Sequence, residues 1–78
     1  MANITEIIQL VALQLGKHRV APEDRFIEDL GAESIDIVNI IATAEERYGL
    51  FISEEAMGRI RTPGDLLAHI QGADRGNR

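Results

Sequence analysis

Apolar residues recur at helical spacing in four stretches of the chain, and no stretch alternates clearly enough to be a strand. The first predicted helix runs from about Ile4 to Leu15. We expect Asn3 to cap this helix, with Glu6 reaching back as the second half of a capping box. Gly16 offers the left-handed conformation that ends a helix. Local sequence therefore predicts both ends of the first helix.

A long connection follows, from Gly16 to Glu33. It contains Pro22 and has no helical periodicity, and loops of this length in compact domains are usually functional or held by anchors of their own. The expected anchors over the helices are Val20, Phe26, Ile27 and Leu30.

The second predicted helix begins at Ser34, runs to about Tyr48 and is stopped by Gly49. It carries two apolar stripes on different sides of the cylinder. The first, a core face, comprises Ile37, Ile40, Ile41, Ala44 and Tyr48. The second comprises Ile35, Val38 and Ala42. Because one helix of so small a bundle rarely buries both sides, we expect part of the second stripe to be an exposed docking surface, with burial of both stripes as the alternative.

A short third helix is predicted after Ile52, starting at Ser53 with acids in its first turn. Met57 and Ile60 are expected to face inward, and Gly58 weakens this helix. The predicted fold is all-α, a four-helix bundle with one long crossover loop and a short third helix.

The fourth helix is predicted to start at Thr62-Pro63-Gly64-Asp65, with threonine as the cap and proline at the first helical position. Leu66, Leu67 and Ile70 are expected to pack inward, and Gly72 to end the helix. The predicted domain therefore spans residues 1–72, with a polar, frayed tail at residues 73–78.

Composition narrows the possible functions. The 78 residues contain no cysteine, which excludes a disulfide framework, thiolate zinc sites and thiol catalysis by the chain itself. A net charge of −5 argues against binding to nucleic acid. The two histidines, His18 and His69, have no second ligand at metal spacing, so no metal site is expected. With so few general bases, a free-standing enzyme is not expected.

The negative charge is concentrated in the middle of the chain. Residues 23–55 carry a net charge of −8, whereas the remaining residues carry +3. Such a centre suits contact with cationic surfaces on other proteins, although acids also simply solvate exposed helix faces. No apolar run is long enough for a membrane span, and Ile7–Leu15 lacks the basic flank and cleavage site of a signal peptide. We therefore expect a cytoplasmic protein without stable membrane insertion.

Residues 29–36 form the segment with candidate chemistry. A serine at a helix N-terminus presents its hydroxyl to solvent, and the unpaired backbone N–H groups there favour a phosphate attached to it. On position alone, the commoner role of Ser34 is that of a helix cap.

The same segment resembles the signature of the acyl carrier protein family, Asp-x-Gly-x-Asp-Ser-Leu-Asp, which here reads Asp29-Leu30-Gly31-Ala32-Glu33-Ser34-Ile35-Asp36. Phe26-Ile27-Glu28-Asp29-Leu30 also resembles the family's approach to that site, and the resemblance covers nearly the whole chain. It implies that a holo-synthase phosphopantetheinyl transferase joins 4′-phosphopantetheine from coenzyme A to Ser34. The thiol of that arm then holds acyl groups as thioesters, and the protein is a non-catalytic carrier.

The resemblance also implies roles for other residues. The partners are acyl-loading, condensing and acyl-transfer enzymes with basic docking patches, which a monomeric carrier would meet through its second helix. The implied partner-binding residues are Glu33, Ile35, Asp36, Val38, Ala42, Glu45 and Glu46. The implied acyl pocket is lined by Ile40, Ala44, Ile52, Met57 and Ile60. The alternative interpretation is that these residues only pack the core.

Departures from the family pattern bear on the pathway. Glu33 replaces the usual aspartate, Ile35 replaces leucine, Asn39 stands at a commonly acidic position, and Arg47 adds a positive charge. These changes predict weaker coupling to the enzymes of general fatty-acid synthesis and a dedicated partner set. The expected pathway is fatty-acid or related lipid biosynthesis, in a specialised form. The alternative within the carrier class is a carrier of aminoacyl, polyketide or peptidyl intermediates. Two alternatives from other classes are a helical interaction domain with unmodified Ser34 and, less favoured, a hydrolase with Ser34 as nucleophile.

Overall fold

The structure is a computed structural model that describes residues 2–76, with side chains for residues 2–73. The described part holds four helices and no strand: α1 (Ile4–Leu15), α2 (Ser34–Tyr48), α3 (Glu54–Met57) and α4 (Pro63–Gly76). The predicted all-α fold, with a long α1–α2 connection and a short third helix, is confirmed.

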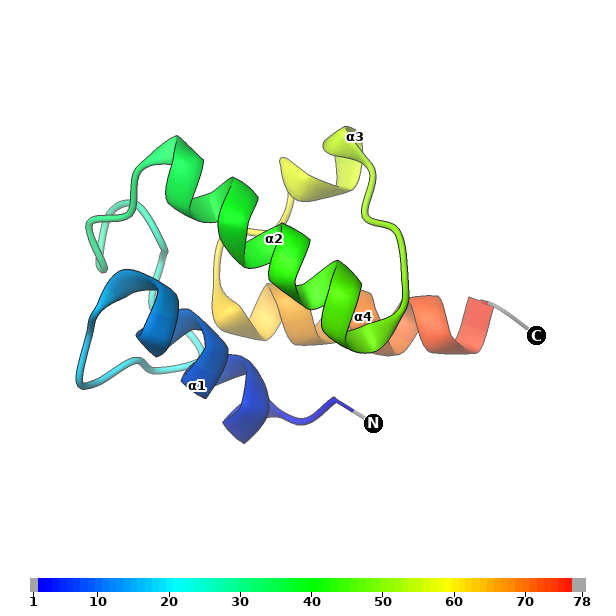
Figure 1. The fold of residues 1–78 in the computed structure, drawn as a ribbon, viewed down its shortest axis with the longest axis horizontal. Helices are drawn as coiled ribbons and strands as arrows, with labels where there is room; N and C mark the ends of the chain where they lie inside the picture. The colour runs from blue at the N-terminus through cyan, green and yellow to red at the C-terminus, as the bar shows by residue number, and fades with distance from the viewer. Residues whose placement is uncertain (1, 77–78) are drawn as a thin grey trace.

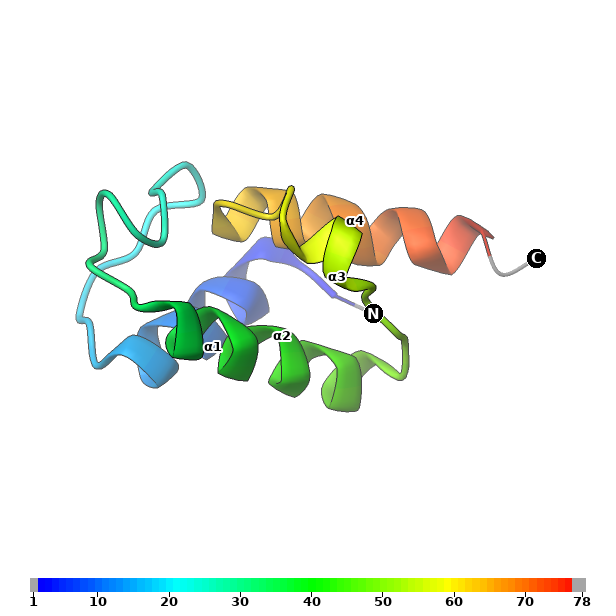
Figure 2. The ribbon, with the colours of Figure 1, turned by 90° about the horizontal axis from the view of Figure 1, so that it is seen from above.

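The three longer helices pack around one core. α1 lies against both α2 and α4, and it runs in the opposite direction to α2 (Figures 1 and 2). The one-turn helix α3 lies in the connection that leads from the end of α2 to the start of α4 (Figure 1). No helix within residues 2–76 combines the length and apolarity needed to span a bilayer.

The core is built from apolar residues of all four helices, of the connections between them and of the segment before α1. Its members are Ala2, Ile7, Leu10, Val11, Phe26, Leu30, Ala32, Ile40, Ile41, Ala44, Ile52, Ala56, Ile60, Leu66 and Ile70. No polar or charged side chain is buried among the described residues. The hydrophobic effect on these apolar side chains is therefore the main source of stability.

The ends of α1 follow the predicted chemistry at two of three points. Asn3 Oδ1 accepts a hydrogen bond from the Glu6 backbone N–H at 2.9 Å, and Gly16 has a left-handed φ of 66°. The prediction that the Glu6 side chain also bonds back to the cap residue Asn3 is wrong. Its carboxylate instead accepts a hydrogen bond from the Tyr48 hydroxyl at 3.0 Å, which ties α1 to the end of α2.

The starts of the two later helices are capped as the sequence predicts. Ser53 Oγ accepts from the Ala56 N–H and Thr62 Oγ1 accepts from the Asp65 N–H, each at 3.0 Å. Pro63 is the first residue of α4, where its missing N–H costs nothing.

The predicted end of α4 is wrong. Gly72 lies inside the helix, which continues to Gly76, so residues 73–76 are helical; the last two residues of the predicted tail, 77 and 78, lie outside the described residues. A glycine stops a helix when the chain adopts positive φ there, as at Gly16 and Gly49. A glycine that keeps helical angles only weakens the helix, by about 1 kcal/mol relative to alanine.

The long connection is held by fewer apolar anchors than predicted. Phe26 and Leu30 are buried and Val20 is half-buried, but Ile27 is 54% exposed. Residues 26–30 form a turn in which the Asp29 and Leu30 N–H groups donate to the Arg25 carbonyl. Residues four apart share a side of such a turn, so Phe26 and Leu30 face the core while Ile27 faces away from it.

Candidate functional site

Ser34 is the first residue of α2, and its side chain is exposed. The cap position belongs to Glu33, whose backbone N–H donates to Asp36 Oδ2 at 2.9 Å. The simple reading of Ser34 as the helix cap is therefore wrong. Its hydroxyl remains available at a helix N-terminus, where free N–H groups and the helix dipole favour an attached phosphate.

The backbone that leads to Ser34 is fastened to the α3–α4 connection. The Phe26 N–H donates to the Arg61 carbonyl at 2.9 Å, and the Phe26 carbonyl accepts from the Ala32 N–H at 2.8 Å. Between them, Gly31 adopts a φ of 70°, a conformation that residues with a side chain rarely adopt. These contacts thus fix the course of residues 26–32, the segment before Ser34, over the core.

An ion pair closes the turn before Ser34. Asp29 Oδ2 accepts from the backbone N–H of Arg25 at 2.9 Å and from Arg25 Nε at 3.0 Å, while Asp29 Oδ1 accepts from Arg25 Nη2 at 3.1 Å. The hydrogen bonds from Arg25 lower the pKa of Asp29, and the same pairing raises the pKa of Arg25. The first residue of the family signature is therefore engaged within the chain.

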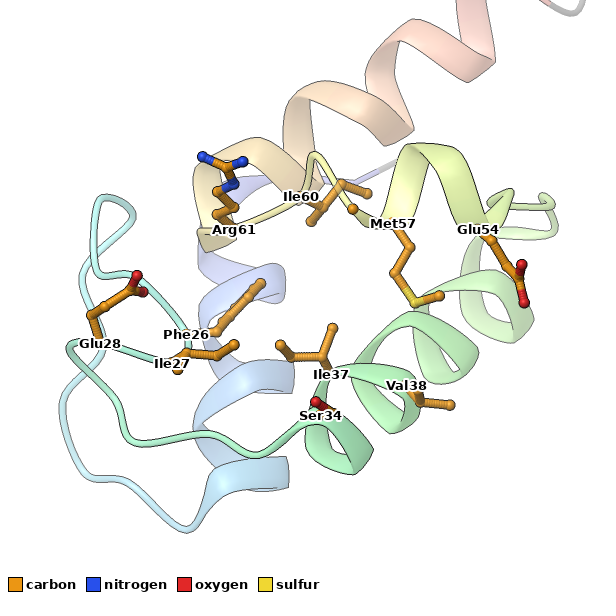
Figure 3. Close-up of a pocket in the computed structure, with 11 residues that line it drawn as sticks. Phe26, Ile27, Glu28, Ser34, Ile37, Val38, Glu54, Met57, Ile60 and Arg61 are labelled. Carbon is orange, nitrogen blue, oxygen red and sulfur yellow. The ribbon is translucent and has the colours of Figure 1, made fainter.

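A groove of about 420 Å³ opens beside Ser34. Its apolar walls include Ile37 and Val38 of α2 and Met57 of α3, with Ile27 and Ile60 from the connections. Figure 3 shows Ser34 at the α2 side of this groove and Arg61 and Glu28 at the far side. An exposed hydroxyl beside an apolar groove suits a phosphodiester-linked arm that carries an apolar group.

Only part of the predicted pocket lines this groove. Met57 and Ile60 do, whereas Ile40, Ala44 and Ile52 are buried in the core and do not. Sequence reasoning missed Phe26, Ile27 and Ile37 as lining residues. Because Ile37 and Phe26 pack on the core as well, periodicity alone could not separate them from it, but the apolar Ile27 beside the buried Phe26 was a usable signal.

The second apolar stripe of α2 is exposed, as predicted. Ile35 is 59% and Val38 is 46% exposed, and Ala42 is exposed on the same helix. The alternative of two buried stripes is wrong. Sequence analysis did not single out two further exposed apolar side chains, Leu13 in α1 and Phe51 after α2.

The four acids expected on this surface differ in their surroundings. Glu33 and Glu46 are exposed, whereas Asp36 and Glu45 are half-buried. Asp36 serves the cap, and Glu45 Oε2 accepts from the Ile52 N–H at 2.7 Å. Glu33 and Glu46 are thus the acids least committed to internal contacts.

Residues that could ligate a metal do not gather in the part of the chain that the structure describes. Within the described residues, no group of three or more histidines, cysteines, aspartates or glutamates is placed to hold an ion. His18 is exposed and His69 is half-buried.

Sequence comparison assigns residues 5–70 to the family model described as "Phosphopantetheine attachment site". The chain is similar to the acyl carrier protein of Helicobacter hepaticus, with 39% identity over 76% of this chain and 78% of that one. It is also similar to the meromycolate extension acyl carrier protein of Mycobacterium bovis, with 35% identity over 99% of this chain and 66% of that one.

Solved structures show the same fold. BlmI, a type-II acyl carrier protein from Streptomyces verticillus involved in bleomycin biosynthesis, matches with a TM-score of 0.80 and 26% identity over 90% of this chain and 83% of that one. The acyl carrier protein of Enterococcus faecalis matches with a TM-score of 0.67 and 27% identity over 88% of this chain and 95% of that one. Sequence, fold and the exposed serine at the head of α2 agree: this chain belongs to the acyl carrier protein family, whose prosthetic group is 4′-phosphopantetheine.

Proposed function

We propose that this chain is a discrete, non-catalytic acyl carrier in which Ser34 Oγ is the attachment point of 4′-phosphopantetheine. The observation that carries the proposal is an exposed hydroxyl at the first position of α2, inside the signature segment, with the helix cap supplied by Glu33 and Asp36. When bound, the group supplies a thiol that holds an acyl group as a thioester. The chain needs such a group for thiol chemistry because it has no cysteine.

The first turn of α2 supports a phosphate on Ser34. The N–H groups at a helix N-terminus and the helix dipole favour negative charge there. Glu33 and Asp36 add negative charge on either side, so an enzyme that modifies Ser34 would approach with cationic groups.

The groove beside Ser34 would hold the acyl group against the protein. Ile37, Met57 and Ile60 offer it an apolar wall, and contact with that wall would reduce the exposure of the acyl group to water. Ile40, Ala44 and Ile52, the deeper members of the expected pocket, would line it only if the core opened.

The exposed stripe Ile35, Val38 and Ala42 would dock on partner enzymes, with Glu33 and Glu46 meeting basic patches at its edge. The partners are a holo-synthase phosphopantetheinyl transferase and acyl-loading, condensing and acyl-transfer enzymes. Charges at the edge of an interface mainly set the association rate and the choice of partner. Asp36 and Glu45 also belong to the expected contact set, but each has an internal hydrogen bond to maintain.

The pathway we propose is fatty-acid or related lipid biosynthesis in the cytoplasm, served by a monomeric carrier with a dedicated partner set. Asn39 and Arg47 support the dedicated partner set because they make α2 less acidic than in carriers of general fatty-acid synthesis. A domain spanning residues 1–72 would suffice for these contacts.

A second candidate is a carrier of aminoacyl, polyketide or peptidyl intermediates. The open groove favours it, since Ile27, Val38 and Arg61 on its walls are exposed while the deeper Ile40 and Ala44 are fully buried. A short or polar cargo needs no deep shelter. BlmI, with the same fold, takes part in bleomycin biosynthesis.

Intact-mass spectrometry tests the proposed attachment. The purified chain is incubated with coenzyme A, Mg²⁺ and a promiscuous phosphopantetheinyl transferase, beside the variants Ser34→Ala and Ser53→Ala. Ser53 is the only other serine of the chain, so it is a matched control. We expect the native chain and Ser53→Ala to gain one phosphopantetheinyl group and Ser34→Ala to gain none. Loading of Ser34→Ala, or no loading of the native chain by several transferases, would overturn the proposal.

A further inference from the structure

The turn before Ser34 is closed by the pair Arg25 and Asp29, which we name the clasp. Both carboxylate oxygens of Asp29 are engaged by Arg25, through two side-chain nitrogens and one backbone N–H at 2.9–3.1 Å. Among the residues that the structure describes, it is the one salt bridge. Such a two-pronged contact fixes direction as well as distance.

The clasp is connected to Ser34 through the backbone. The Arg25 carbonyl accepts from the N–H groups of Asp29 and Leu30, so the clasp and these bonds shape the same turn. Phe26, the next residue, donates to Arg61 and accepts from Ala32, which lies two residues before Ser34. A change in the conformation of this turn would therefore shift the backbone at the start of α2, because only these few hydrogen bonds and residues separate the two.

Apolar anchoring alone does not define this turn. Burial of Phe26 and Leu30 fixes how deeply the segment sits, but the hydrophobic effect has no direction. The Arg25 N–H at the start of the turn also needs an acceptor, and Asp29 supplies it.

We infer that Arg25 and Asp29 are positioning residues for the modification of Ser34: the clasp holds the turn that sets where the Ser34 hydroxyl is presented. This assigns Asp29, a member of the family signature, a role within the chain instead of a direct contact with the transferase. It also assigns the same role to Arg25, which lies outside the signature. The inference rests on the proposed attachment at Ser34.

The test compares steady-state loading kinetics of the full chain with the variants Asp29→Ala, Arg25→Ala and the double variant. Glu23→Ala and Arg19→Ala, exposed residues of the same connection, are the charge-matched controls. Misplacement of a reacting group lowers kcat, and we expect each clasp variant to lose about tenfold to a hundredfold in kcat with little change in KM. The double variant should lose no more than Asp29→Ala alone, because Asp29→Ala already removes every bond of the clasp, whereas Arg25→Ala keeps the bond from the backbone N–H of residue 25.

Arg25→Lys adds a graded variant, since lysine keeps the charge but cannot donate the two-pronged contact. It should load faster than Arg25→Ala and slower than the native chain. Far-UV circular dichroism of every variant checks that α1, α2 and α4 are formed, and if Asp29→Ala is unfolded, Arg25→Ala decides.

Native kcat in Arg25→Ala would overturn the inference, and so would a raised KM with unchanged kcat in Asp29→Ala, which marks a direct contact with the transferase. Failure of the native chain to load at all would instead overturn the proposed attachment, so the two failures are distinguishable.

Discussion

The carboxylate of Glu45 in α2 accepts a hydrogen bond from the backbone N–H of Ile52 at 2.7 Å, across the connection that leads to α3. The next residue, Glu46, is exposed. Two adjacent acids that look equivalent in the sequence therefore differ in role: Glu45 holds the path of the chain toward α3, while Glu46 faces solvent.

This difference predicts separate effects of the two acids on stability. Glu45→Ala leaves the part-buried Ile52 N–H without its charged acceptor and should lower the free energy of unfolding by about 2 kcal/mol. Glu46→Ala should change it by less than about 0.5 kcal/mol. Urea unfolding followed by circular dichroism measures both values, and equal losses would contradict the assignment.

The exposed stripe of α2 predicts a loss of partner affinity without a loss of stability. Val38→Asp should raise the KM for the transferase about tenfold, the effect of losing roughly 1.4 kcal/mol of binding. Leu13→Asp is the control, because Leu13 is also an exposed apolar residue but lies on α1. Similar losses in both variants would show that exposed apolar area in general, and not this stripe, determines binding.

Two glycines predict opposite responses to alanine. Gly49 ends α2 with a φ of 66°, so Gly49→Ala should cost about 1–2 kcal/mol of stability. Gly58 has right-handed helical angles, and an added Cβ would lie in ordinary contact, 3.5 Å from the Glu55 carbonyl oxygen. Gly58→Ala should therefore be neutral or stabilise by up to about 1 kcal/mol. Thermal unfolding of both variants checks the pair, and a larger loss for Gly58→Ala would be inconsistent with these backbone angles.

Tyr48 predicts a loss of stability in alkaline solution. Partial burial, together with its hydrogen bond to Glu6, raises the pKa of Tyr48 above its usual value of 10.0. As pH rises past 10, tyrosine in the unfolded chain loses its proton first, so the unfolded state binds fewer protons and the free energy of unfolding falls. This contribution is complete below pH 10 and is lost as pH rises through the folded pKa.

Thermal unfolding between pH 8 and 11 tests the Tyr48 prediction against the variant Tyr48→Phe. The variant removes the titrating hydroxyl and keeps the ring, so its midpoint temperature should fall less steeply above pH 10. Parallel curves for the two proteins would exclude Tyr48 as the cause.

Local signals in the sequence predicted the helix starts and the two left-handed stops. Asn3, Ser53 and Thr62 each satisfy N–H groups within their own first turn, so no tertiary information is needed to identify them. Gly72 misled because a glycine ends a helix only where the rest of the fold turns the chain away. The sequence of α4 does not contain that information.

The position of Ser34 at the start of α2 was predicted from the sequence, whereas the residues that line the groove beside it were predicted only in part. The signature marks the serine directly, but the groove forms where the connection at Ile27, the start of α2 and Met57 meet. Those segments are distant in the chain, and helical periodicity assigned Ile40 and Ala44 to the pocket because it reports only which side of α2 is apolar. The position of Glu45 was hidden for the same reason, since its partner is a backbone group seven residues away.

At the start of α2, the residues that cap the helix are different from the residue that is proposed to be modified, and this separates folding from modification. Glu33 occupies the cap position and its N–H donates to Asp36, so the cap does not use the hydroxyl of Ser34. We expect the chain to fold before Ser34 is modified. We also expect repeated loading and removal of acyl groups on the proposed arm to leave the architecture unchanged. Position 34 should therefore accept other side chains and non-native attached groups without loss of the fold.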